Sequence, residues 1–102
     1  MPKRRDGNHA LIRDGLRQLG YDVEDTADLG DGFPDLLVVT KQGFVLLDKK
    51  SYGFIILLEV KMPGQKLTPK EAKFHARFPG PLYVVRSLEM AVETVQSVER
   101  MK

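Results

Sequence analysis

The spacing of apolar residues predicts three helices. Between residues 8 and 19, Ile12, Leu16 and Leu19 recur at helical spacing with Leu11 beside them, and Gly20 follows where such a helix would end. A second helix is expected from Thr68 to near Pro79, because the sequence TPKE at 68–71 combines a capping residue, a first-turn proline and a capping-box glutamate. Ser87 is placed to cap a last helix, whose apolar stripe comprises Leu88, Ala91, Val92, Val95 and Val98.

Short apolar runs predict strands between these helices. Residues 35–40 and 44–47 are typical of a hairpin that turns at 41–43, and the nearly continuous apolar run at 54–61 is typical of a central strand covered on both faces. Short strands are also expected at 21–24, before an acidic loop that ends at residue 32, and at 82–85. This order indicates one α/β domain over residues 1–102, with a small central mixed β-sheet flanked by helices.

Composition narrows the class of function. A chain of 102 residues can bury one core but not two independent ones. The absence of cysteine excludes disulfides, cysteine-ligated metals and a thiol nucleophile, and two histidines exclude a three-histidine zinc site. The net charge of only +2 means that any nucleic-acid binding depends on local clusters of basic residues. With no apolar run near the roughly 20 residues of a membrane-spanning helix and no apolar signal segment, we expect an intracellular, cytoplasmic protein without a membrane partner.

Three charged residues near strand ends are the candidates for chemistry. Glu59 and Lys61 are two apart on a predicted strand and share a face, whereas Val60 points into the core. If the strand beginning at Asp35 lies alongside, directly or with its hairpin partner between, its carboxylate joins them. Two carboxylates with a backbone carbonyl suit Mg²⁺ or Mn²⁺, and an adjacent ammonium suits phosphodiester hydrolysis. The alternative is a structural ion pair of Lys61 with Glu59 or Asp35, and spacing alone does not decide between them.

Four segments in order carry a resemblance to a known family: FPD at 33–35, LEVK at 58–61, KLTP at 66–69 with FH at 74–75, and VVRS at 84–87. Together they resemble the VRR-NUC family of the PD-(D/E)XK nuclease superfamily, over roughly residues 8–95. The resemblance implies a restriction-endonuclease-like fold and cleavage of DNA that depends on Mg²⁺ or Mn²⁺. For small stand-alone members it also implies homodimers that act in DNA repair on branched DNA such as Holliday junctions. By position, Asp35 and Glu59 would be metal ligands, Val60 would lend its carbonyl, and Lys61 would be the catalytic lysine.

Three further residues are candidates for auxiliary roles. Family members often have an acidic residue three positions after an asparagine in the first helix, but here Asn8 is followed by Leu11, so that acid is missing. Where many relatives have glutamine, this chain has Glu71, which either completes the capping box of Thr68 or contacts a metal or water. His75 lies one turn beyond Glu71 and either approaches the phosphate or packs at the helix surface.

The densest basic segment offers contacts to the DNA backbone, although a solvated helix face is the alternative for each residue. These candidates are Lys66, Lys70, Lys73 and Arg77. Arg86, beside Ser87, either contacts phosphate as well or only favours the exit of its strand. We therefore expect a structure-selective endodeoxyribonuclease that acts as a homodimer, because so short a chain exposes little surface to grip a duplex. The alternatives are a flap or single-strand nuclease within a replication or repair assembly, and a catalytically idle DNA-binding module on the same scaffold. If a virus encodes the chain, the expected location is the host cytoplasm.

Overall fold

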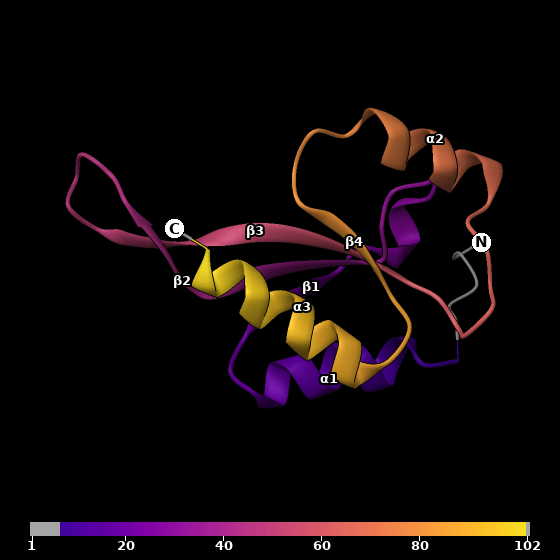
Figure 1. Ribbon diagram of the computed structural model, residues 1–102, viewed down its shortest axis with the longest axis horizontal. Helices are drawn as coiled ribbons and strands as arrows, with labels where there is room; N and C mark the ends of the chain where they lie inside the picture. The colour runs from indigo at the N-terminus through magenta and orange to yellow at the C-terminus, as the bar shows by residue number, and fades with distance from the viewer. Residues whose placement is uncertain (1–6, 102) are drawn as a thin grey trace.

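The computed structural model describes residues 7–101 and has the mixed α/β architecture that the sequence predicts (Figure 1). None of the helices in this range is long and apolar enough to cross a membrane. In chain order the elements are α1 (His9–Gln18), β1 (Asp22–Asp25), the 3-10 helix η1 (Ala27–Leu29), β2 (Leu36–Val45), β3 (Ser51–Val60), α2 (Pro69–Arg77), β4 (Leu82–Val85) and α3 (Leu88–Arg100).

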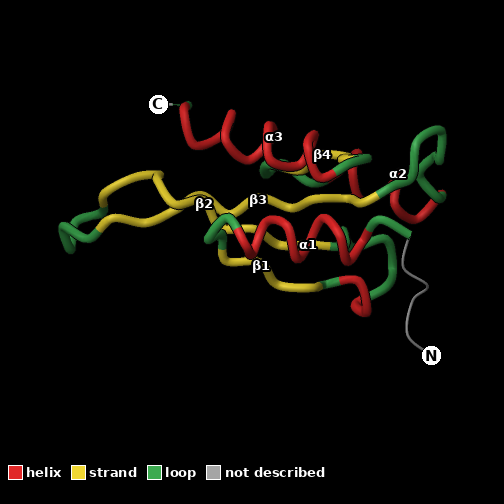
Figure 2. The backbone as a smooth tube through the Cα atoms, turned by 90° about the horizontal axis from the view of Figure 1, so that it is seen from below, coloured by secondary structure: helices red, strands yellow, loops and turns green. Residues whose placement is uncertain are grey.

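The four strands form one sheet in the order β1-β2-β3-β4. The pairs β1–β2 and β2–β3 are antiparallel, whereas β4 runs parallel to β3, as a strand reached through a crossover helix must. Helices α1 and α3 lie against one face of the sheet, and α2 lies on the other side, near the end of β3 (Figures 1 and 2). The sheet therefore has a core face under two helices and a second face that α2 covers only at one end.

The core is built on the face toward α1 and α3. Alternate strand residues point there, because successive side chains of a strand project to opposite faces. These are fully buried against apolar residues of both helices: Leu36, Val38, Ile56, Leu58 and Val60 from the sheet, Ile12 and Leu16 from α1, and Ala91 and Val95 from α3. Each fully buried leucine or isoleucine contributes about 1.5–3 kcal/mol to folding. The same alternation sends Glu59 and Lys61 to the opposite face, beneath α2.

The hairpin turns later than the sequence predicts. β2 continues through residues 41–43, and the turn lies at 46–50, where Lys49 has a φ of 64°. The predicted turn at 41–43 is instead an irregularity of register between Val39 and Gly43, after which Gly43 pairs with Gly53. A Cβ at Gly53 would lie 1.9 Å from the carbonyl oxygen of Thr40. The prediction was wrong because the two glycines let the strands approach closely and resume pairing beyond a bulge.

The starts of α2 and α3 were predicted correctly, but the burial of several apolar residues was not. Thr68 forms the complete capping box with Glu71, and Ser87 Oγ accepts from the amide of Met90, as expected. α2 ends at Arg77, just short of Pro79. Ile55 is 58% exposed, so β3 is covered on both faces only in its second half. Leu11 and Leu19 are likewise exposed rather than part of the buried stripe of α1.

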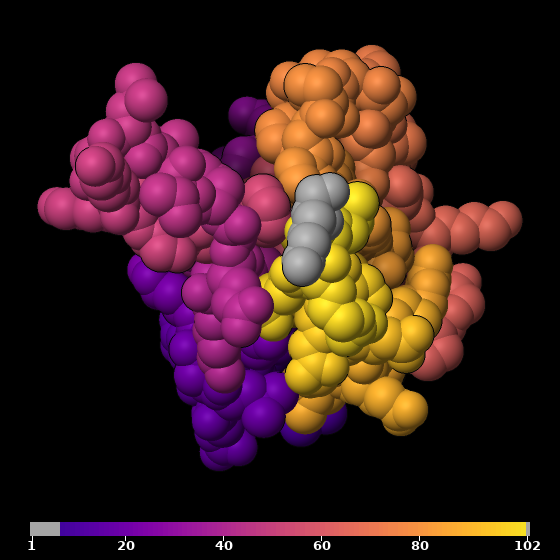
Figure 3. All heavy atoms as spheres, turned by 60° about the vertical axis from the view of Figure 1, so that its left-hand side comes forward, coloured from indigo at the N-terminus to yellow at the C-terminus, as the bar shows by residue number. Residues whose placement is uncertain are grey.

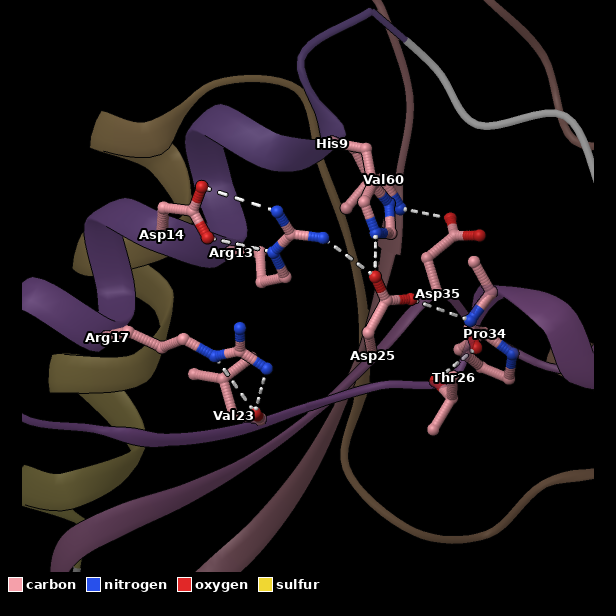
Figure 4. A network of polar contacts seen from close by, with 11 residues as sticks. His9, Arg13, Asp14, Arg17, Val23, Asp25, Thr26, Pro34, Asp35 and Val60 are labelled. Atoms are coloured by element: carbon pink, nitrogen blue, oxygen red, sulfur yellow. Dashed lines mark hydrogen bonds and ion pairs between the residues drawn. The ribbon is translucent and has the colours of Figure 1, made fainter.

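A polar network ties α1 to the end of β1 (Figure 4). Nε2 of His9 lies 3.0 Å from Oδ2 of Asp25, and Nη1 of Arg13 donates to the same oxygen at 3.0 Å. The other carboxylate oxygen accepts from the amide of Ala27. Burial by itself acts to raise the pKa of Asp25, but these three hydrogen bonds outweigh it and hold the pKa well below its usual range.

We expect Asp25→Asn to lower the free energy of unfolding by roughly 2 kcal/mol at neutral pH, since it replaces charge-assisted hydrogen bonds with weaker ones. A carboxyl with a depressed pKa in the folded state stabilises the protein above its unfolded pKa of about 3.9, and this contribution is lost as the pH falls through the folded value. Urea titrations of both chains between pH 7 and pH 2 should therefore show the difference shrinking toward zero in acid. A difference that stays constant over this range would contradict the assignment.

Candidate active site

β2 and β3 bring Asp35 and Glu59 to the same end of the sheet. The last paired residues at this end are Leu36 and Leu58, and the amide of Asp35 donates to the carbonyl of Leu58 at 3.0 Å. Oδ2 of Asp35 accepts from the amide of Val60 at 2.8 Å, so its carboxylate lies against the backbone adjoining Glu59. Of the two arrangements that the sequence left open, the strands are therefore direct neighbours.

The backbone on both sides of Asp35 is fixed by the loop that follows β1 (Figure 4). Oγ1 of Thr26 donates to the carbonyl of Pro34 at 2.7 Å, and the amide of Thr26 donates to the carbonyl of Asp35 at 2.9 Å. Asp35 itself is only 6% exposed. Its carboxylate is thus held in one orientation by an amide of β3 and a rigid backbone, as a preorganised ligand requires.

Glu59 is completely buried on the face that α2 covers. Its Oε1 lies 3.3 Å from Nε2 of His75, which projects from α2. Burial lowers the pKa of His75, which Glu71 acts to raise and Lys61 to lower further. His75 therefore does more than pack at the helix surface, because it contacts a predicted metal ligand as an imidazole whose neutral form is favoured.

Lys61 is paired with Glu71 from α2. Nζ of Lys61 lies 2.7 Å from Oε1 of Glu71, and both side chains are almost fully buried. The same carboxylate oxygen accepts from the amide of Thr68 at 2.8 Å, which completes the capping box. The ion pair that we considered, between Lys61 and Glu59 or Asp35, was the wrong pairing. Glu71 both caps α2 and neutralises the lysine, a partnership that depends on where α2 crosses the sheet.

Asn8 and Arg86 hold the backbone where β3 leaves the sheet. Nδ2 of Asn8 donates to the carbonyls of Lys61 and Arg86, at 3.1 and 3.0 Å. Nη1 of Arg86 donates to the carbonyls of Met62 and Gln65. Sequence reasoning missed both roles, since Asn8 bonds to residues 53 and 78 positions away and the spacing carries no local signal. A phosphate contact by Arg86 stays a prediction.

The other predicted phosphate contacts lie on and before α2. Lys70, Lys73 and Arg77 are exposed and share one stripe of the helix at i, i+3, i+7 spacing, and Lys66 is exposed in the preceding loop. Lys70 is 3.5 Å from Asp31, in a pair so exposed that it contributes little to stability. The guanidinium of Arg77 lies 4.6 Å from the ring centre of Phe74. The stripe is thus a set of accessible cations beside the helix face that carries Glu71 and His75.

A comparison with known families supplies the decisive observation. The family model for the VRR-NUC domain matches residues 5–97, which is nearly the whole chain. The chain belongs to the VRR-NUC family. No curated protein and no solved structure gave a match. VRR-NUC is a nuclease domain, so DNA is the substrate class that membership indicates, and the four-stranded mixed sheet with three helices is the small restriction-endonuclease-like fold expected for it.

The donors at this VRR-NUC site fit a hard divalent cation. Within residues 7–101, no three His, Asp or Glu side chains form a group that could hold a metal ion. A site built on Asp35 and Glu59 would therefore offer two carboxylates, and the carbonyl of Val60 would be the third donor from the protein. Mg²⁺ binds in this way, because it is held by one or two carboxylates and keeps several waters.

If the stripe on α2 of this VRR-NUC chain contacts phosphates, Lys73→Gln should weaken binding to every DNA tested and lower its salt dependence. Each lost phosphate contact reduces the slope of log affinity against log salt by about 0.9. Fluorescence anisotropy in EDTA, between 50 and 200 mM salt, measures this slope. The control is Arg100→Gln, an exposed cation of α3, which should leave the slope unchanged. Equal slopes for the parent and Lys73→Gln would mean that Lys73 does not contact a DNA phosphate.

Proposed function

We propose that this VRR-NUC chain is a structure-selective endodeoxyribonuclease that depends on Mg²⁺ or Mn²⁺ and cleaves branched DNA such as Holliday junctions as a homodimer. The observation that supports the proposal is the 2.8 Å hydrogen bond from the amide of Val60 to the carboxylate of Asp35, which holds that carboxylate against the backbone that directly follows the buried Glu59. Two carboxylates held at adjoining strand ends form the core of a phosphodiester-cleaving site.

Asp35, Glu59 and the carbonyl of Val60 would hold the cation. The chemistry that a bound divalent cation supplies is activation of water at neutral pH and neutralisation of phosphoryl charge. The carboxylate of Asp35 is preorganised for this role, because the amide of Val60 donates a hydrogen bond to one of its oxygens. Glu59 is shielded from bulk water, which strengthens its attraction for a cation.

Lys61 places an ammonium two residues from Glu59, on the same face of β3. We assign it to orienting the attacking water and to stabilising negative charge that develops on the phosphate. Glu71 holds this ammonium at 2.7 Å, so the lysine is positioned before DNA arrives. His75, whose pKa is lowered mainly by burial, supports the orientation of Glu59 through their 3.3 Å contact.

The small basic surface supports the proposal of a homodimer on a branched substrate. The cations of α2 form one exposed stripe, and a chain of 102 residues offers little further surface to grip a long duplex. A two-fold pair of copies would double this footprint and present two sites related by symmetry, which matches the symmetry of a four-way junction.

The test is cleavage of a labelled panel containing a four-way junction, a flap, a single strand and a linear duplex, each with Mg²⁺, Mn²⁺, Ca²⁺ or EDTA. We expect cuts in the junction with Mg²⁺ or Mn²⁺ and none in EDTA. If cleavage is confined to flaps or single strands, branched junctions are not the substrate, and the protein is a flap or single-strand nuclease. Folded protein that binds junctions and cuts no DNA under any condition would overturn the proposal in favour of an idle binding module.

A further inference from the structure

The β2–β3 hairpin extends well beyond the rest of the sheet and carries apolar side chains into solvent (Figures 1 and 2). We call residues 41–52 the arm. Leu47 at its tip is wholly exposed, Val45 is 66% exposed and Leu46 is 52% exposed. The ring of Phe44 stacks on Tyr52, with 6.0 Å between ring centres, and this contact stiffens the arm. A run of four exposed apolar residues is unfavourable in water and marks an interaction site.

The charge at the tip of the arm is positive. Asp48, Lys49 and Lys50 lie within the turn at 46–50. The carboxylate of Asp48 is engaged within the turn, where it accepts from the amide of Lys50 and the hydroxyl of Tyr52. The two lysine side chains are exposed. The arm therefore presents an apolar surface that ends in two cations.

A complementary surface lies between β4 and α3 of the same chain. Two hollows of about 530 and 360 Å³ adjoin there and share Tyr83, Val98 and Met101 as lining residues. We call the pair of hollows the groove. Its remaining apolar lining includes Phe54, Pro79, Pro81 and Met90, and its charged lining residues are both acidic, Glu89 and Glu93.

We infer that the arm of one copy binds in the groove of a second copy, and that the arm of the second copy binds reciprocally in the groove of the first. In this dimer the apolar tip of the arm packs against the apolar residues of the partner's groove. Lys49 and Lys50 of the arm form ion pairs with Glu89 and Glu93 of the groove. The dimensions agree: residues 44–47 span about 13 Å as a strand, and the 13 residues of α3 provide a wall about 20 Å long. A second copy is favoured over an unrelated protein because the arm and the groove belong to one chain. A two-fold dimer would bury both arms and fill both grooves at once.

The exchange leaves the candidate active site accessible. The arm projects from one end of the sheet, whereas α2 and the end of β3 that carries Glu59 lie at the other (Figure 1). The base of the arm is anchored to α3, where Oε2 of Glu99 accepts from the amides of Lys41 and Gln42, and Figure 3 shows the rest of the arm on the side of the molecule beside that helix. The inference supplies a surface for the homodimer proposed above and does not require that the protein cut DNA.

Leu47→Asp tests the exchange by placing a charge in the apolar contact. Because Leu47 makes no buried contact, the variant should fold with the melting temperature of the parent. Sedimentation velocity over a concentration series, without DNA or metal, should show a dimer for the parent and a dimer dissociation constant at least ten-fold higher for Leu47→Asp. The matched control is Leu29→Asp, which alters a leucine that is 64% exposed outside the arm and the groove, and it should dimerise as the parent does.

Charge reversal tests the pairing itself. The variants Lys49→Glu/Lys50→Glu and Glu89→Lys/Glu93→Lys should each dimerise weakly alone, because like charges then meet in both contacts of the dimer. An equimolar mixture should form heterodimers with an affinity near that of the parent, since both contacts are complementary again. A monomeric parent, an unaffected Leu47→Asp dimer, or a mixture no tighter than its components would each overturn the inference. A monomer that cleaves junctions would overturn this inference and the proposed homodimer while leaving the proposed nuclease activity intact, and a dimer that never cleaves would overturn the nuclease activity alone.

Discussion

Asp35→Asn should reduce cleavage of junction DNA at least about 100-fold while leaving the fold intact. The amide oxygen of asparagine can still accept from the amide of Val60, as Oδ2 of Asp35 does at 2.8 Å, but the negative charge that attracts a divalent cation is lost. Stabilisation of charge by a catalytic metal is worth several kcal/mol, and about 1.36 kcal/mol corresponds to each ten-fold change in rate. Single-turnover cleavage at saturating protein and fixed Mn²⁺ measures the chemical step.

Asp35→Ala separates the chemical role of this residue from its structural one. Alanine removes both the charge and the acceptor, so the amide of Val60 loses its partner at a cost of roughly 1–3 kcal/mol of stability. Asp22→Asn, an exposed carboxylate on β1, is the control and should cleave at the parental rate. If Asp35→Asn were to cleave within two-fold of the parent, the carboxylate would have no part in the chemistry.

Lys61→Met should abolish measurable cleavage and also destabilise the protein by about 3–5 kcal/mol, since removing one partner of a buried ion pair deprives the other charge of that contact. Glu71 would be that charge, because its carboxylate lies 2.7 Å from Nζ of Lys61 and is buried. Cleavage should fall with the loss of the ammonium that stabilises charge on the phosphate. Chemical denaturation and single-turnover cleavage measure the two effects separately.

The double variant Lys61→Met/Glu71→Gln distinguishes catalysis from stability. Glutamine keeps an oxygen that can accept from the amide of Thr68, so the capping box of α2 is retained while the buried charge is removed. We expect most of the lost stability to return and cleavage to stay absent. Recovery of cleavage together with stability would mean that Lys61 serves only to pair with Glu71.

The elements that local chemistry specifies were predictable from the sequence. Thr68 and Ser87 start α2 and α3 because their side chains accept from amides three residues ahead, a signal complete within one turn. The turn of the hairpin was not predictable, because it depends on Gly43 meeting Gly53 across the two strands. Glycine in an apolar run suggests a turn when it is considered alone, and only the pairing reveals a bulge.

The candidate site was likewise predictable only in part. The common face of Glu59 and Lys61 follows from strand periodicity, and the nearness of Asp35 follows once β2 and β3 are neighbours. The partners of these residues come from α2, whose path over the sheet no local pattern encodes. The pairing of Lys61 with Glu71 and the contact of His75 with Glu59 could therefore be found only from the folded arrangement.

Calorimetric titration of Mn²⁺ into the folded protein, without DNA, tests most directly whether Asp35 and Glu59 together form a cation site. We predict saturable binding by the parent and by Asp22→Asn, and binding at least ten-fold weaker for Asp35→Asn and for Glu59→Gln. Glu59→Gln preserves the shape of a fully buried side chain, so it should change charge with little change in packing. Equal Mn²⁺ affinity in all four chains, or no binding by the folded parent, would contradict the convergence of the two carboxylates on one cation.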